Sequence, residues 1–98
     1  MMTLTAIIRA KPGHAGTVKQ ALLDVIAAVR RNEPDTVDYY VGQSADDRDV
    51  FTTFERFRDQ AAMEKHNDSP AVAGFVAVAG PVLADKVVIQ ICNELAAK

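Results

Sequence analysis

Two strand-like runs, Thr36–Gln43 and Val50–Phe57, are separated by only six, mostly polar, residues. In the first run Val37, Tyr39 and Val41 occupy every second position, which is typical of a strand with one buried face. A connection this short joins antiparallel neighbours, so the two runs are predicted to form a β-hairpin. The chain is thereby restricted to folds that contain an antiparallel sheet.

The register of this hairpin determines which side chains meet. We expect Val41 to lie opposite Phe51, which would bring Tyr39 close to Thr53 and place Glu55 on the same face. Side chains alternate with a period of two, so a slip of one residue would send the whole set to the other face. This interpretation gathers an acid and several aromatic side chains on one side of the sheet.

The rest of the chain supplies two more strands and two helices. Residues 3–10 alternate, with Leu4, Ala6, Ile8 and Ala10 on an apolar face. Apolar residues at steps of three and four predict a helix over 15–31, which Pro34 stops. The remaining predicted elements are a helix from Arg58–Asp59 to about Val78, interrupted and capped again at Ser69–Pro70, and a last strand over residues 86–92.

The element order β-α-β-β-α-β predicts an α+β, ferredoxin-like fold with a four-stranded antiparallel sheet. Right-handed crossovers place the first and third strands in the centre and both helices on one face. The other face is partly apolar, and packing it against a second copy would remove it from water. We therefore expect a homodimer, a dimeric α/β barrel.

Composition limits the partners and the compartment. The 98 residues make one domain, 1–98. Eleven Lys and Arg residues are scattered among thirteen Asp and Glu residues, so no basic surface for nucleic acid is expected. No run approaches the ~20 apolar residues of a membrane span, and no signal-peptide pattern begins the chain. With Cys92 as the single cysteine, expected to be buried in the last strand rather than reactive, we expect a cytoplasmic protein.

Three segments of the chain carry a family resemblance. They are Glu33-Pro34-Asp35-Thr36-Val37-Asp38-Tyr39, the strand end Phe54-Glu55-Arg56-Phe57, and Gln60-Ala61-Ala62-Met63-Glu64-Lys65-His66 followed by Ser69-Pro70. Together they resemble the antibiotic biosynthesis monooxygenase (ABM) superfamily. The resemblance extends over essentially the whole chain. Phe57 stands where the family often has Trp, Asp35 replaces a turn Gly, and Ala71 replaces a second His. These departures argue against the haem-degrading branch and against a mechanism that uses two histidines.

The resemblance implies a dimeric ferredoxin-like protein with a cavity between sheet and helices. It implies oxidation of phenols or quinols by molecular oxygen without a metal or flavin. Some relatives are isomerases of small carbonyl compounds, and others have no assigned role. By position, the resemblance places Tyr39, Glu55, Phe57 and His66 in the cavity.

The residue types fit this chemistry. A phenol becomes an electron donor when a base removes its proton, and histidine is the natural base near neutral pH. His66 is the candidate base, and Glu55 could orient it or bond a substrate hydroxyl. Phe51, Phe54, Phe57 and Phe75 could form walls for a planar ring. His14 and His66 lie on separate elements and no glycine-rich nucleotide loop occurs, so neither a metal nor a nucleotide cofactor is expected.

Each candidate also has a structural interpretation. His66 could bond a backbone carbonyl at a helix end, Glu55 could accept from a tyrosine or an amide, and Tyr39 could pack across strands. The leading hypothesis is therefore a monooxygenase acting on a small quinol-like or polyphenolic molecule. An isomerase that shuttles protons between His66 and Glu55, and a non-catalytic binding or dimerisation module, remain as alternatives.

Overall fold

The computed structural model describes all residues, 1–98, and confirms the predicted element order. The chain forms one antiparallel sheet in the order β2-β3-β1-β4, so the first and third strands are central as predicted. The predicted second helix is divided in two. The elements are β1 (Met2–Arg9), α1 (Ala15–Asn32), β2 (Thr36–Gln43), β3 (Val50–Phe57), α2 (Gln60–Asn67), α3 (Pro70–Ala79), the 3₁₀ turn η1 (Gly80–Val82) and β4 (Val88–Asn93).

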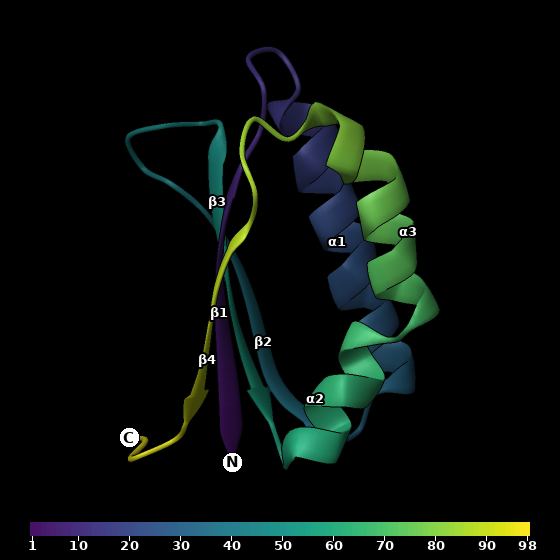
Figure 1. Ribbon diagram of the computed structural model, residues 1–98, viewed down its shortest axis with the longest axis vertical. Helices are drawn as coiled ribbons and strands as arrows, with labels where there is room; N and C mark the ends of the chain where they lie inside the picture. Colours follow the sequence, from purple (N-terminus) through teal and green to yellow (C-terminus); the bar gives the residue numbers. More distant parts are fainter.

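The helices all lie on one face of the sheet, and the other face is open (Figure 1). Side chains of β1 that point toward the helices are buried, as the alternation predicted, and they pack against the apolar stripe of α1. This two-layer arrangement leaves the space for a site between sheet and helices. The buried residues that carry the packing are Leu4, Ala6, Ile8, Ala10, Val18, Ala21, Leu22, Phe51 and Phe57.

The predicted hairpin register was wrong by two residues. Val41 lies opposite Thr53, and Tyr39 lies opposite Glu55 rather than near Thr53. The reason is the turn, where the Ser44 hydroxyl accepts backbone N–H bonds and the Asp47 carboxylate accepts one from Asp49. These bonds centre the turn further along the chain than expected. A shift of two residues keeps every side chain on its predicted face.

α2 and α3 begin directly after Asp59 and Ser69, the residues predicted to open them. The Asp59 carboxylate accepts from the backbone N–H of Ala62, and the Ser69 hydroxyl accepts from that of Val72. Pro70 occupies the first turn of α3, where its missing N–H costs nothing. The break between the two helices ends α2 just after His66, which faces the sheet.

The last strand corrects one expectation. Every residue of β4 is exposed, and Cys92 is an exposed free thiol rather than a buried side chain. β4 is an edge strand, and Cys92 pairs with Thr3 on the face that the helices leave open. In the whole chain no helix combines the length and apolarity needed to cross a membrane.

Candidate functional site

A buried histidine between two carboxylates forms the centre of the site. His66 Nδ1 lies 2.7 Å from Glu33 Oε1, and His66 Nε2 lies 3.3 Å from Glu55 Oε1. The His66 side chain is only 2% exposed. A buried charge is tolerated only when it is paired, and here the imidazole and the carboxylates satisfy each other.

Glu55 belongs to the predicted site, and the structure explains how a carboxylate is held there. It lies on the central strand β3 and points into the layer between sheet and helices. Its Oε2 accepts a 2.8 Å bond from the Thr53 hydroxyl, while its Oε1 faces His66. Each carboxylate oxygen has two lone-pair sites, so Glu55 can still accept a proton or a hydrogen bond from a bound molecule.

Glu33 was not predicted as a site residue. It follows α1 directly, and the Thr36 hydroxyl donates a 2.9 Å bond to the same oxygen that faces His66. In the sequence it had been interpreted only as part of the helix stop before Pro34. The one feature of the sequence that could have indicated Glu33 is its place directly before Pro34, where the backbone is restricted. Its partner His66 lies 33 residues away in the chain, and only the fold brings the two side chains together.

The two carboxylates decide the charge of His66. Burial lowers the pKa of His66, but the hydrogen bonds that its ring donates to Glu55 and Glu33 outweigh this effect and raise the pKa above its usual value. Burial, together with repulsion from Glu55 and Glu33, raises the pKa of Tyr39 well above its usual range. The imidazolium is thus favoured, and Tyr39 is a neutral phenol.

Stability should therefore depend on pH through His66. A raised folded-state pKa stabilises the protein fully below the unfolded value of 6.5, and this contribution is lost as pH rises through the folded-state pKa. We expect the melting temperature to fall as the pH rises from about 6.5 through the raised pKa of folded His66. His66→Gln should flatten this dependence in thermal melts. Parallel curves for the two proteins would contradict the assignment.

Aromatic rings pack against the imidazole. The ring centroids of Tyr39 and Phe57 each lie 5.5 Å from that of His66, tilted by 60° and 40° respectively. Tyr39 lines the cavity beside the site, whereas Phe57 is fully buried next to His66 and does not line the cavity. Phe57 was predicted to contact the substrate. It instead packs against the imidazole ring of His66, which does line the cavity.

A cavity of about 160 Å³ adjoins the paired groups. Its walls are largely apolar, and Glu55, His66, Tyr39 and Thr53 form a polar end. Phe75 lines this cavity as predicted, but Phe51 does not, because it is buried in the core beyond it. The other lining residues are Leu4, Ala6, Ile8, Leu22, Val25, Asn67, Val72, Val76, Val87 and Ile89.

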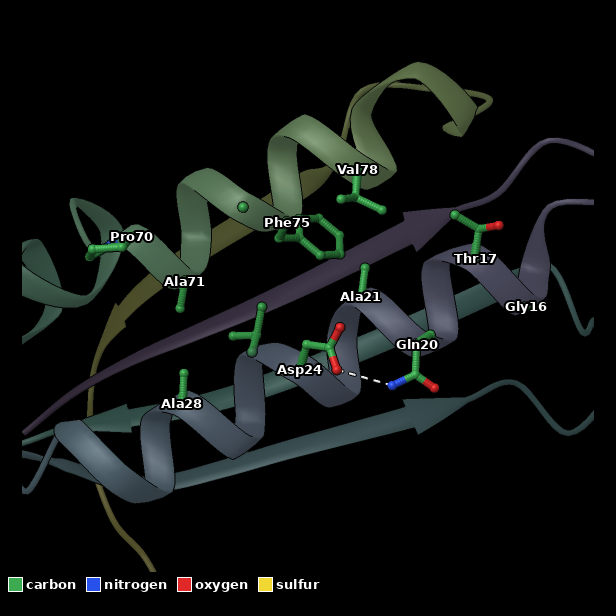
Figure 2. Close-up of a pocket in the computed structure, with 12 residues that line it drawn as sticks. Gly16, Thr17, Gln20, Ala21, Asp24, Ala28, Pro70, Ala71, Phe75 and Val78 are labelled. Atoms are coloured by element: carbon green, nitrogen blue, oxygen red, sulfur yellow. Dashed lines mark hydrogen bonds between the residues drawn. The ribbon is translucent and has the colours of Figure 1, made fainter.

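A larger groove of about 630 Å³ runs between α1 and α3 on the outside of the helix layer (Figure 2). Its single ionisable side chain, Asp24, accepts a 3.0 Å bond from Gln20. Phe75 lies between the helices and lines both the groove and the inner cavity (Figure 2). The groove lacks a histidine and a buried acid, so the inner cavity is the better candidate for chemistry.

Comparison with known proteins agrees with this architecture. Residues 1–78 match the family model described as antibiotic biosynthesis monooxygenase. A structure from Pseudomonas aeruginosa shares 32% identity, with a TM-score of 0.87, over 97% of this chain and 94% of that one. No curated protein sequence matches the chain.

More distant structures show the same fold. A Caulobacter crescentus structure has 23% identity and a TM-score of 0.89, covering 97% of this chain and 90% of that chain. A Nitrosomonas europaea structure has 18% identity and a TM-score of 0.90, covering 98% of this chain and 100% of that chain. Both proteins are provisionally described as antibiotic biosynthesis monooxygenases.

Proposed function

The chain belongs to the antibiotic biosynthesis monooxygenase family, and from this premise we propose that it is a cofactor-independent monooxygenase of a small quinol or polyphenol. The observation that carries the proposal is the buried Glu55–His66 pair at the polar end of an apolar cavity. Such a cavity can hold an aromatic ring and present its hydroxyl to a base.

The reaction begins with proton transfer. Because His66 is held as a cation, Glu55 rather than the predicted His66 is the base in this proposal. The substrate O–H bond breaks, an O–H bond forms on Glu55, and the cationic His66 stabilises the resulting phenolate. The phenolate then reduces molecular oxygen: one oxygen atom replaces a ring hydrogen, the other is released as water, and the quinol is oxidised to a hydroxyquinone, which leaves as its anion. The apolar walls separate the reactive species from water. Tyr39, as a neutral phenol, can donate a hydrogen bond to the substrate but does not compete for its proton.

Cavity size narrows the substrate class. An apolar cavity of ~150 Å³ accommodates benzene, and this cavity of about 160 Å³ is similar. A single-ring hydroquinone or catechol therefore fits better than a two-ring quinol. The polar end favours a substrate with at least one hydroxyl.

Oxygen consumption tests the proposal directly. The protein is mixed with hydroquinone, catechol and a naphthohydroquinone in air-saturated buffer, with protein-free mixtures as the background. We expect uptake above background, fastest with the single-ring substrates. Uptake equal to background for every quinol would reject the proposed activity.

An isomerase is the second candidate, because an imidazole held between two carboxylates can move protons without oxygen. In that case the protein would exchange a carbon-bound proton of a small carbonyl compound in deuterated, anaerobic buffer. Exchange without any oxygen uptake would favour the isomerase over the monooxygenase. If the protein shows neither oxygen uptake nor proton exchange, a non-catalytic binding module is favoured.

We also propose that two copies pair through the open sheet face. Large apolar side chains are exposed on this face, and Arg56 with its partners Asp38 and Glu94 forms a polar border. A monomer rarely leaves such a patch in water. The exposed apolar residues are Ile7, Tyr40, Phe54 and Val88.

Phe54→Glu should weaken this dimer, because it places a carboxylate in the apolar patch of each protomer and brings the two carboxylates close to each other at the interface. We expect at least a ~10-fold higher dissociation constant, about 1.4 kcal/mol, measured by sedimentation. Val78→Glu, on the exposed side of α3, is the matched control and should leave the dimer intact. A wild-type protein that sediments only as a monomer at micromolar concentration would reject the dimer.

A further inference from the structure

We propose that Glu33 is a positioning residue of this site and the group through which buried His66 exchanges its proton with water. The proposal rests on the proposed function for its catalytic consequence. The position of the proton, however, can be measured without any reaction. Glu33 does not line the cavity, so its role would be exerted through His66.

The contacts place Glu33 behind the imidazole ring. Its Oε1 lies 2.7 Å from Nδ1, closer than Glu55 Oε1 lies to Nε2, and Thr36 holds that oxygen from the other side. His66 and Glu55 line the cavity, whereas Glu33 does not. Glu33 therefore fixes the ring so that Nε2, and not Nδ1, is directed toward Glu55 and the cavity.

The Glu33 side of the ring is also the side nearer to solvent. The Glu33 side chain is 11% exposed, compared with 6% for Glu55. A surface depression of about 40 Å³ borders both Glu33 and His66. A site that holds water needs about 10–15 Å³ and polar partners, and this depression provides both.

The ring chemistry then defines a route for the proton. Since each ring nitrogen faces a carboxylate, both nitrogens carry hydrogen and the ring is an imidazolium. For release, the Nδ1–H bond breaks, an O–H bond forms on Glu33, and the proton passes to water in the depression. His66 is left neutral, with its Nε2–H still donated to Glu55.

This route restores the charge of the three groups after the proposed reaction. While the phenolate is present, its negative charge is paired with the cationic His66. Once the phenolate has been oxidised and its product has left, Glu55 still holds the substrate proton, and Glu33, Glu55 and His66 together carry one more positive charge than at the start. Release of the His66 proton through Glu33 returns their net charge to its starting value. A buried site avoids accumulating unpaired charge in this way.

Other charged or titratable groups near the ring are few. Tyr39, from β2, packs on the ring as a neutral phenol, and Phe57, from β3, is apolar. Lys65 and Asp35 line the depression on the solvent side. Glu33 is the group in hydrogen-bonding contact with Nδ1, so it controls that nitrogen more directly than they do.

Nitrogen-15 NMR of the His66 ring tests the proposal on the ligand-free protein. In the wild type, Nδ1–H should exchange with water faster than Nε2–H. Glu33→Gln should lower the titration midpoint of His66 by about one pH unit or more, because an opposite charge is lost. Glu33→Asp keeps the charge and should restore most of the shift. Glu64 is an exposed acid on α2, the helix that carries His66, so Glu64→Gln should leave the titration midpoint of His66 unchanged.

Two results would overturn the proposal. One is an unchanged His66 midpoint in folded Glu33→Gln, and the other is faster exchange of Nε2–H than of Nδ1–H in the wild type. The second measurement needs no variant, so it decides even if Glu33→Gln does not fold. If the NMR results hold but no quinol is oxidised, the monooxygenase proposal fails while the role of Glu33 in holding the proton stands.

Discussion

His66→Ala is expected to lower quinol-dependent oxygen uptake about 10²- to 10³-fold, the usual effect of removing one group that stabilises a developing oxyanion. The substitution removes the cation that would stabilise the phenolate, and it leaves Glu55 facing Glu33 without a positive charge between them. A lone carboxylate is then a poor base, because the phenolate that it would create has no counter-ion. The measurement is initial oxygen uptake at saturating quinol.

The chain offers a matched control for this experiment. His14, the other histidine, is exposed in the turn before α1 and makes no side-chain capping bond. His14→Ala should leave oxygen uptake unchanged. His66→Gln keeps hydrogen-bonding capacity but removes the charge. If its thermal melting matches that of the wild type while its oxygen uptake is lost, the loss is one of chemistry and not of folding. Wild-type activity in folded His66→Ala would remove His66 from the mechanism.

Phe57→Ala should lower the free energy of unfolding by about 3–5 kcal/mol. Phe57 is fully buried, and its ring packs on His66 and in the core between sheet and helices. Truncation removes this apolar burial and leaves a cavity that a central strand cannot collapse to fill. Since small domains are stable by only about 5–15 kcal/mol, the loss should be evident in urea denaturation.

Phe54→Ala is the control, with the same residue type on the same strand but the opposite face. Phe54 is 40% exposed, so its truncation should cost less than that of Phe57. If the open face forms a dimer, the loss for Phe54→Ala should also depend on protein concentration, unlike most of the loss for Phe57→Ala. Equal losses for the two variants would contradict the difference in burial.

Local patterns predicted most of the architecture. The helix caps at Asp59 and Ser69 and the alternation of β1 depend on residues close together in the chain, so they can be recognised without knowledge of tertiary contacts. The exposure of Cys92 was missed because alternation does not tell an edge strand from a central one. The hairpin register was missed because it depended on turn hydrogen bonds made by Ser44 and Asp47.

Only some of the residues predicted for the site line the cavity. Tyr39, Glu55, His66 and Phe75 line one cavity, whereas Phe57 supports the ring of His66 and Phe51 belongs to the core. Phe51, Glu55 and Phe57 share one face of β3, so the pattern alone could not say which of them borders empty space. That distinction depends on where α2 and α3 pass over the sheet.

By itself, then, the sequence determined the element order and the antiparallel hairpin, because periodicity and capping are carried along the chain. With the family resemblance it also named Glu55 and His66 as candidate site residues. Only the tertiary structure decided that Glu33 completes the site. Its carboxylate meets His66 because the end of α1 packs beside the end of α2. Such a contact is stabilised by burial and charge pairing between distant segments, and no local pattern encodes it.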